Sequence, residues 1–269
     1  MKPGNLIMDY PAQSLTCCAS KFKTYTVEQI DGHLYIIGAG RIGDEKETFK
    51  MDKMSSTTML VSLLVLYEQL TPNLYGHVEE RITNLDESYI MNWCIANGTP
   101  METGGSDGSI ADADSIWSKY GKVGFRIDSF YNQLHDLYQC YMLWRRLSCD
   151  DTTKENPYTD TPLETCKESL YVRMLTMNVR LRPNFECYPP TFYLECADCM
   201  AVAKAHMFFL CVSADAPYVG VCEVCGKPFA KMRRNNTQCE TCQRNKSQRS
   251  RKNKRIAEIA QKSAKERTD

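Results

Sequence analysis

The sequence lacks any apolar run long enough to cross a membrane, and it lacks a segment with the composition of an export signal. Its longest apolar run lies near residues 59–67, whereas a membrane-spanning helix needs about 20 apolar residues. The N-terminal stretch MKPGNLIMDYPAQ has no apolar core of the signal-peptide type. We therefore expect a cytoplasmic protein that makes no membrane contact and keeps its thiols reduced.

Recognised catalytic motifs are also missing, and none surrounds His33, His77, His135 or His206. GAGRIG at 38–43 has the G-x-G-x-x-G spacing of a dinucleotide site, but the charged run DEKETFKMDK stands where that site needs an amphipathic helix. We interpret GAGRIG as a flexible turn. We expect no catalytic residues and no enzymatic activity, the alternative being a catalytic cluster assembled from distant residues.

Cysteine, by contrast, is abundant, with 14 copies, and four of them form two pairs near the C-terminus. Two residues separate Cys222 from Cys225 and Cys239 from Cys242, and thirteen residues lie between the pairs. This spacing is typical of a zinc site in which each pair supplies one edge of a tetrahedron. Four thiolates leave no open position, so we expect one structural zinc ion. A redox dithiol would need one pair in a βαβ context, and disulfides would need an oxidising compartment.

The residues around the pairs predict a treble-clef arrangement of knuckle, hairpin and helix. Gly226 follows the first pair, where a knuckle turn needs a residue that tolerates positive φ. The residues between the pairs can fold back as a short hairpin. Cys239 and Cys242 run directly into a sequence compatible with a helix, so we expect both in its first turn.

This segment resembles a known family. The run C-x-x-C-G-K-P-F, then Asn235 and Asn236, then a cysteine pair entering an Arg/Lys-rich helix, is similar to the CGNR-type zinc finger over residues 221–255. In that family the finger stands at the C-terminus behind a helical domain called ABATE, and the proteins are bacterial DNA-binding transcription regulators. The resemblance implies the same layout here, with an ABATE-like body and DNA as the partner.

Charge is distributed unevenly along the chain, although 33 basic and 33 acidic residues cancel overall. From Gly226 to the end there are 14 Lys/Arg and 4 Asp/Glu, so the preceding residues hold 19 basic and 29 acidic groups. A basic tail of net charge +10 behind a body of net charge −10 indicates an anionic partner for the tail. The alternative is that the tail lies on its own acidic body.

The basic residues point all round the expected helix, which therefore has no face to bury. The candidate nucleic-acid contacts are Arg233, Arg234, Arg244, Lys246, Arg249, Arg251, Lys252, Lys254 and Arg255. A DNA major groove admits a helix between two anionic walls, which suits this pattern. RNA is the alternative partner, but the tail lacks interleaved aromatics for stacking on single-stranded bases, which favours duplex DNA. A protein-interaction module or an enzyme with a purely structural zinc is the remaining hypothesis.

A weak apolar stripe follows the basic block, and the alternatives for its packing partner are the body and a second subunit, which would make a homodimer. The stripe comprises Ile256, Ile259, Ala260 and Ala264.

Hydrophobic periodicity predicts a mainly α fold: a helical body with a small N-terminal β-hairpin over 1–217, and the finger with its long basic helix over 218–269. The hairpin is expected over 23–37, around the turn Asp31-Gly32. Helices are expected over about 55–70, 75–83, 86–97, 126–147, 163–179 and 192–212, with loops at 101–113 and 148–162. Residues 1–22 show no clear pattern.

Cys196 and Cys199 form a third closely spaced pair, with His206 and Cys211 downstream. We read the surrounding residues as one continuous helix, on which Cys211 lies more than three turns away from the pair. We therefore interpret these cysteines as core residues, with a second metal site as the alternative.

Overall fold

A computed structural model describes residues 15–19, 21–41, 47–51, 53–71, 86–101, 120–148, 151–153, 156–175, 180–184, 191–196, 198–212, 219–231 and 235–265. The chain separates into two compact units, residues 1–216 and 217–269. The first unit is called the body below, and the second is called the finger unit. The helix predicted over 75–83 and most of the loop predicted over 101–113 lie outside the described residues.

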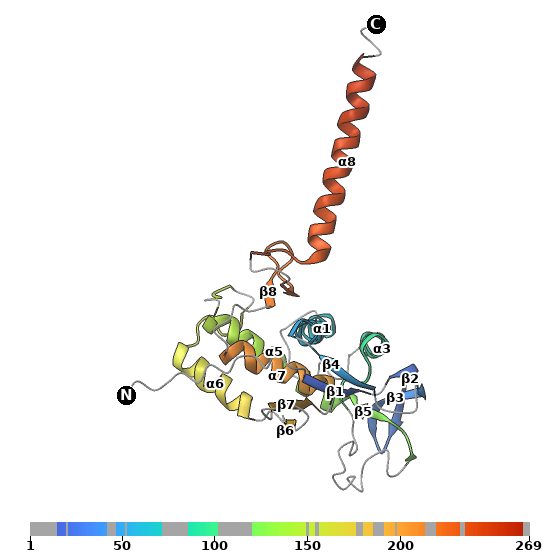
Figure 1. Ribbon diagram of the computed structural model, residues 1–269, viewed down its shortest axis with the longest axis vertical. Helices are drawn as coiled ribbons and strands as arrows, with labels where there is room; N and C mark the ends of the chain where they lie inside the picture. The colour runs from blue at the N-terminus through green and yellow to red at the C-terminus, as the bar shows by residue number, and fades with distance from the viewer. Residues whose placement is uncertain are drawn as a thin grey trace. The chain divides into compact units, whose positions relative to one another are not determined.

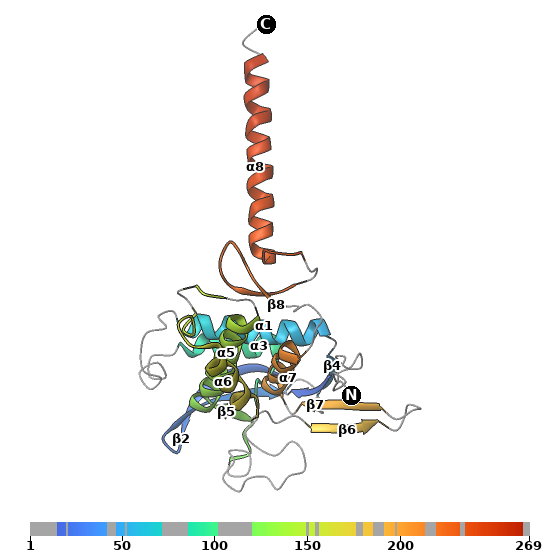
Figure 2. The same ribbon diagram turned by 90° about the vertical axis from the view of Figure 1, so that its left-hand side faces the viewer.

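The body is built around the long helix α5, which packs against three other helices (Figure 1). Apolar residues on α5 recur at helical spacing, and Phe130, Leu134 and Tyr141 are completely buried. This confirms α5 as a core element. The body helices are α1 (Lys53–Leu70), α3 (Glu87–Asn97), α5 (Ile127–Ser148), α6 (Leu163–Leu175) and α7 (Cys199–Val212), and α5 contacts α1, α6 and α7 (Figure 2).

Capping interactions define both ends of helix α3. The Asp86 side chain accepts a hydrogen bond from the backbone N–H of Ser88 at 3.0 Å, which satisfies one of the unpaired donors at the helix start. At the other end Gly98, with φ 92°, donates its backbone N–H to Cys94 O at 2.8 Å. Both ends confirm the sequence prediction.

The predicted N-terminal hairpin is confirmed by strands β2 (Phe22–Ile30) and β3 (His33–Arg41). Asp31 and Gly32 have φ values of 50° and 80°, the left-handed pair that a two-residue hairpin turn requires. A third strand, β5 (Gly124–Arg126), adds to the free edge of β3. The hairpin is thus part of a three-stranded sheet.

Reading GAGRIG as a flexible turn was wrong for its first four residues, because Gly38 to Arg41 belong to β3. A β-carbon on Gly38 would lie 2.3 Å from the Phe22 ring on the neighbouring strand. The glycine is needed because an aromatic ring covers the strand at that point, and the phosphate-loop spacing is coincidental.

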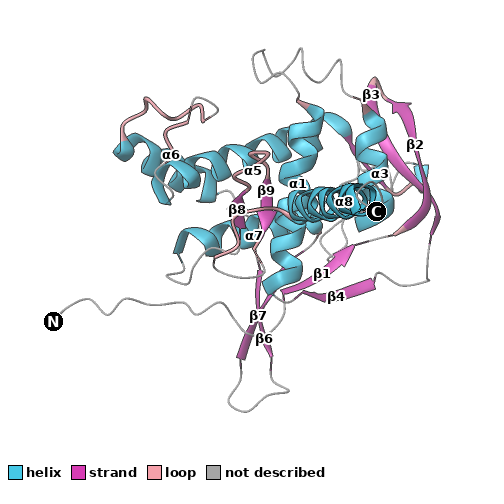
Figure 3. Cartoon of the chain, turned by 90° about the horizontal axis from the view of Figure 1, so that it is seen from above, coloured by secondary structure: helices cyan, strands magenta, loops and turns pink. Residues whose placement is uncertain are grey.

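A second sheet, which the sequence analysis missed, has the strand order β4-β1-β7-β6 (Figure 3). Its members are β1 (Leu15–Ala19), β4 (Glu47–Met51), β6 (Arg180–Asn184) and β7 (Thr191–Cys196). One prediction fails here, because the helix predicted over 192–212 begins only at Cys199. Residues 1–22, which showed no clear pattern, contain strand β1. Short apolar runs fit strand and helix equally well, and here the pairing of β7 with β1 and β6 decides.

The mainly helical character of the body is confirmed, but seven strands in two sheets accompany its five helices in the described residues. Helices α1 and α7 contact both each other and strands of the four-stranded sheet. The body therefore combines a helical core with two sheets, rather than a helical bundle carrying one hairpin.

The segment after α5, predicted as a polar loop, contains a buried ion pair. Arg145 Nη2 lies 2.6 Å from Asp151 Oδ2, and both side chains are at most 10% exposed. Burial alone would raise the pKa of Asp151, but hydrogen bonds from the N–H and hydroxyl of Thr153, together with the charge of Arg145, lower it. The loop is therefore tied to the end of α5 through a carboxylate that stays ionised.

Replacing Asp151 with asparagine should destabilise the body by about 3 kcal/mol at neutral pH, because the Arg145 charge would lose its buried partner. A carboxyl with a lowered folded pKa stabilises fully above its ordinary value of about 3.9 and loses that contribution as pH falls through the folded pKa. The difference between wild type and Asp151→Asn in urea unfolding should therefore shrink below about pH 4. The exposed Asp160→Asn is the control, and equal effects of the two substitutions would contradict the prediction.

Candidate metal centre

The four cysteines of the finger unit lie together in space. All four sulfurs are within 4.8 Å of one another, and none is in a disulfide. The sulfurs of Cys225 and Cys239 are 3.8 Å apart. Four thiolates placed about 2.3 Å from a tetrahedral ion lie about 3.8 Å from one another. The cluster therefore has the donor set and the size to hold a metal ion.

The first cysteine pair lies in the turn between two short antiparallel strands, β8 (Val219–Val221) and β9 (Pro228–Ala230). Cys222 follows β8 directly, and its N–H donates to Lys227 O at 2.9 Å across the turn. Gly226 has φ 70° and donates its N–H to Cys222 O at 2.8 Å, which confirms the need for a glycine there.

The hairpin itself is not where the sequence analysis placed it. Only β9 lies between the cysteine pairs, because the turn through Cys222 and Cys225 reverses the chain onto β8. The first pair therefore stands at the tip of the hairpin. The chain then returns, and Glu223 donates its N–H to Thr237 O at 3.0 Å, holding the approach to the second pair against the first.

The second pair is at the start of α8 (Glu240–Lys265), as predicted. Cys239 precedes the helix and accepts the N–H of Gln243 on its carbonyl oxygen at 3.0 Å, while Cys242 lies in the first turn. The Gln243 side chain donates to Asn236 Oδ1 at 2.5 Å and to Gln238 O at 2.9 Å. These bonds fix the cysteine-bearing segment against the first turn of α8.

Cys222 and Cys242 differ in how readily their thiols ionise. Burial opposes ionisation of Cys222, but backbone N–H groups, first that of Cys239 at 3.3 Å, outweigh it and lower its pKa to about 6. The neighbouring cysteine sulfurs, Cys239 foremost, raise the pKa of Cys242 to about 12. Hydrogen bonding among the sulfurs, with a smaller contribution from the charge of Cys222, therefore keeps Cys242 protonated, and a divalent cation at the centre of the cluster would favour the thiolate.

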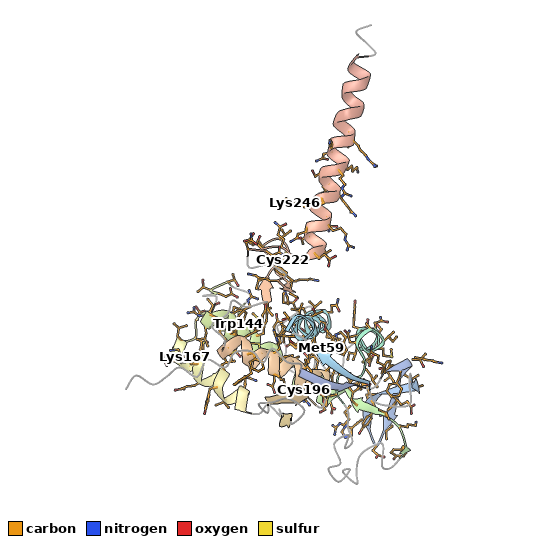
Figure 4. The ribbon with its side chains drawn as sticks, viewed as in Figure 1. Met59, Trp144, Lys167, Cys196, Cys222 and Lys246 are labelled. Atoms are coloured by element: carbon orange, nitrogen blue, oxygen red, sulfur yellow. The ribbon has the colours of Figure 1, made fainter. Side chains whose placement is uncertain are left out.

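The predicted nucleic-acid contacts that are described lie on α8 and are exposed. Figure 4 shows Lys246 on this helix, beyond Cys222 of the metal cluster. The seven are Arg244, Lys246, Arg249, Arg251, Lys252, Lys254 and Arg255. Arg244 forms an ion pair with Glu240 at 2.9 Å. Arg233 and Arg234 lie outside the described residues, as do the side chains at 259, 260 and 264 of the apolar stripe, whereas Ile256 is 55% exposed.

The expectation of a continuous helix around Cys196 and Cys199 was wrong. Cys196 ends β7 and Cys199 begins α7, where Asp198 accepts the N–H of Ala201 at 2.7 Å. Both cysteines are buried. In the part of the chain that the structure describes, the only side chains grouped closely enough to hold a metal are the four finger cysteines.

Sequence reasoning missed a buried polar link between α1 and α7. The His206 ring lies between two hydroxyls, with Nδ1 3.0 Å from Ser56 Oγ and Nε2 3.0 Å from Thr57 Oγ1. All three side chains are at most 1% exposed. The link satisfies polar groups inside the core. Its one sequence signal is a histidine within an apolar helical segment.

Compared with known protein families, curated proteins and solved structures, the chain matches none. Among the described residues, no helix combines the length and apolarity needed to cross a membrane.

Proposed function

We propose that the protein binds nucleic acid through α8, that duplex DNA is its partner, and that it acts as a transcription regulator. The observation that carries the proposal is a metal-ligand cluster at the start of a 26-residue helix, α8, whose seven basic side chains between Arg244 and Arg255 are exposed. A site built in this way aims a cationic helix from a fixed starting point.

The metal in this proposal is one zinc ion per chain. A tetrahedral set of four thiolates is the usual environment of structural zinc, and it leaves no position open for a substrate or for water. Zinc would link the β8–β9 hairpin to the first turn of α8, so its role would be to fold the finger unit as a treble clef.

The charge of α8 supports a polyanionic partner. Residues 243–256 are exposed on every side of the helix, and seven of the twelve from Arg244 to Arg255 are basic. A helix of this kind stays solvated or lies between anionic walls. The resemblance of residues 221–255 to the CGNR-type finger supports duplex DNA and a regulatory role, with the body as an ABATE-like sensing or dimerisation domain.

The proposal is tested by titrating a labelled duplex with the full chain at several salt concentrations. If about five side chains reach phosphates, log K against log salt should have a slope near −4.5, so a fourfold rise in salt should weaken binding about 500-fold. A variant with all seven basic residues of 244–255 changed to glutamine should lose this dependence, while zinc content stays the same.

Single-stranded DNA and double-stranded RNA of matched length serve as the comparison ligands. Tighter binding of RNA than of the DNA duplex would mean that the protein is an RNA-binding protein. Equal duplex affinity of wild type and the glutamine variant would refute nucleic-acid binding by α8 and favour a protein-interaction role.

A further inference from the structure

We propose that α8 engages the duplex through one face only, the face turned away from the metal centre. This inference rests on the proposed function and specifies its interface. The recognition face consists of Arg244, Gln248, Arg251 and Arg255, and the metal-side face consists of Cys242, Lys246, Arg249 and Asn253.

Both faces follow from the helical repeat. Successive residues of an α-helix are rotated by about 100°, so positions spaced four, three and four residues apart fall on one stripe. Arg244, Gln248, Arg251 and Arg255 have this spacing, and so do Cys242, Lys246, Arg249 and Asn253. The centres of the two stripes lie about 160–170° apart, on opposite sides of the helix.

The metal-side face is obstructed at the start of α8. Cys242 is directed into the sulfur cluster, and Gln243, on the flank about 90° from the centre of this face, binds Asn236 and Gln238 of the preceding segment. A duplex approaching this side over the first turns would meet the hairpin and its knuckle. On the opposite side the first turns present only exposed side chains, and the exposed ion pair of Arg244 with Glu240 can be exchanged for an acceptor in the groove at little cost.

The chemistry of the recognition face suits a groove floor. Arginine donates two parallel hydrogen bonds to guanine O6 and N7, and glutamine pairs in the same way with adenine N6 and N7. Lys252 and Lys254 lie about 80° to either side of the stripe, where a helix in the major groove meets the two walls of phosphates. Lysine acts there as a point charge on phosphate, while the planar arginine forks face the bases.

Two double variants of the full chain separate the faces. Arg251→Gln with Arg255→Gln changes the recognition face, and Lys246→Gln with Arg249→Gln changes the metal-side face. Each removes two positive charges from exposed positions of α8, so general electrostatic attraction falls equally in both. Zinc content and far-UV circular dichroism should match wild type, because neither pair includes a candidate metal ligand.

With a labelled duplex of mixed sequence, we expect the recognition-face variant to lose affinity at least about tenfold more than the metal-side variant. Equal losses, or a larger loss in the metal-side variant, would overturn the inference while leaving nucleic-acid binding intact. Absence of salt-dependent binding by wild type would refute the proposed function itself, and with it the one-face assignment.

Discussion

Replacing Cys222 with serine should unfold the finger unit and leave the body folded. Cys222 is 1% exposed, and its sulfur accepts the N–H of Cys239 at 3.3 Å, so it joins the hairpin to the foot of α8 even before a metal is considered. A structural zinc ion contributes about 10–16 kcal/mol to folding of small metal domains, far more than the short β8–β9 hairpin can supply. An isolated helix as polar as α8 is at best marginal in water, so helical content should fall with the metal.

The measurement combines elemental analysis with far-UV circular dichroism and limited proteolysis. Wild type should carry one zinc ion per chain. Cys222→Ser or chelation should remove the zinc and make the finger unit susceptible to protease. Cys211→Ser, at a half-buried position on α7, is the matched control and should keep the zinc. Wild-type protein without zinc, or a Cys222→Ser variant with full zinc and an uncleaved finger unit, would contradict the prediction.

The grouping of the metal ligands could be predicted because the spacing of cysteines constrains the chain locally. Two cysteines separated by two residues can reach one ion only through a tight turn or a helix start. Gly226 identified the first pair as a turn, and the residues after Cys242 identified the second pair as a helix start. The position of the hairpin was not encoded in the same way. The strand after the knuckle pairs with the strand before it because the chain reverses direction through Cys222 and Cys225. Cysteine spacing alone does not define where this reversal occurs.

The four-stranded sheet could not be predicted, because its pairings are distant in sequence. Cys17 pairs with Cys196 in parallel register, and neither neighbourhood has an alternating pattern strong enough to indicate a strand. Local periodicity identified α5 because that helix buries a wide apolar stripe over 22 residues. Short segments such as β1 and β7 become strands because neighbouring strands pair with them, and local sequence does not encode that pairing.

The proposed division of α8 into two faces could likewise not be predicted from the sequence. Basic residues point in every direction, so charge alone does not select a face. The proposed selection comes from Cys242, whose place in the sulfur cluster shows which side of the helix the knuckle occupies. All seven basic residues are exposed, so under the proposal the metal site favours one face by blocking approach at the first turn of α8 and not by covering any basic side chain.

Replacing Trp144 with alanine should destabilise the body by about 3–5 kcal/mol. Trp144 projects from α5 (Figure 4). It is 2% exposed, packs against Tyr141 with ring centroids 6.0 Å apart, and donates its indole N–H to Leu210 O at 3.2 Å. Alanine would leave a cavity between α5 and α7 and an acceptor without its donor, and close-packed interiors relax only partly around such a loss.

Urea unfolding of the body, followed by tyrosine fluorescence and circular dichroism, measures the effect. Tyr171→Ala is the control, since Tyr171 is 65% exposed on α6 and its loss should change stability by no more than about 0.5 kcal/mol. Trp144→Phe should fall between the two, because a phenyl ring fills most of the space but cannot donate to Leu210 O. The zinc content should be the same in all three variants, because the metal ligands belong to the finger unit. If Trp144→Ala lowered the free energy of unfolding by less than about 1 kcal/mol, the change would be close to that expected at an exposed position. Such a result would mean that α5 does not organise the core.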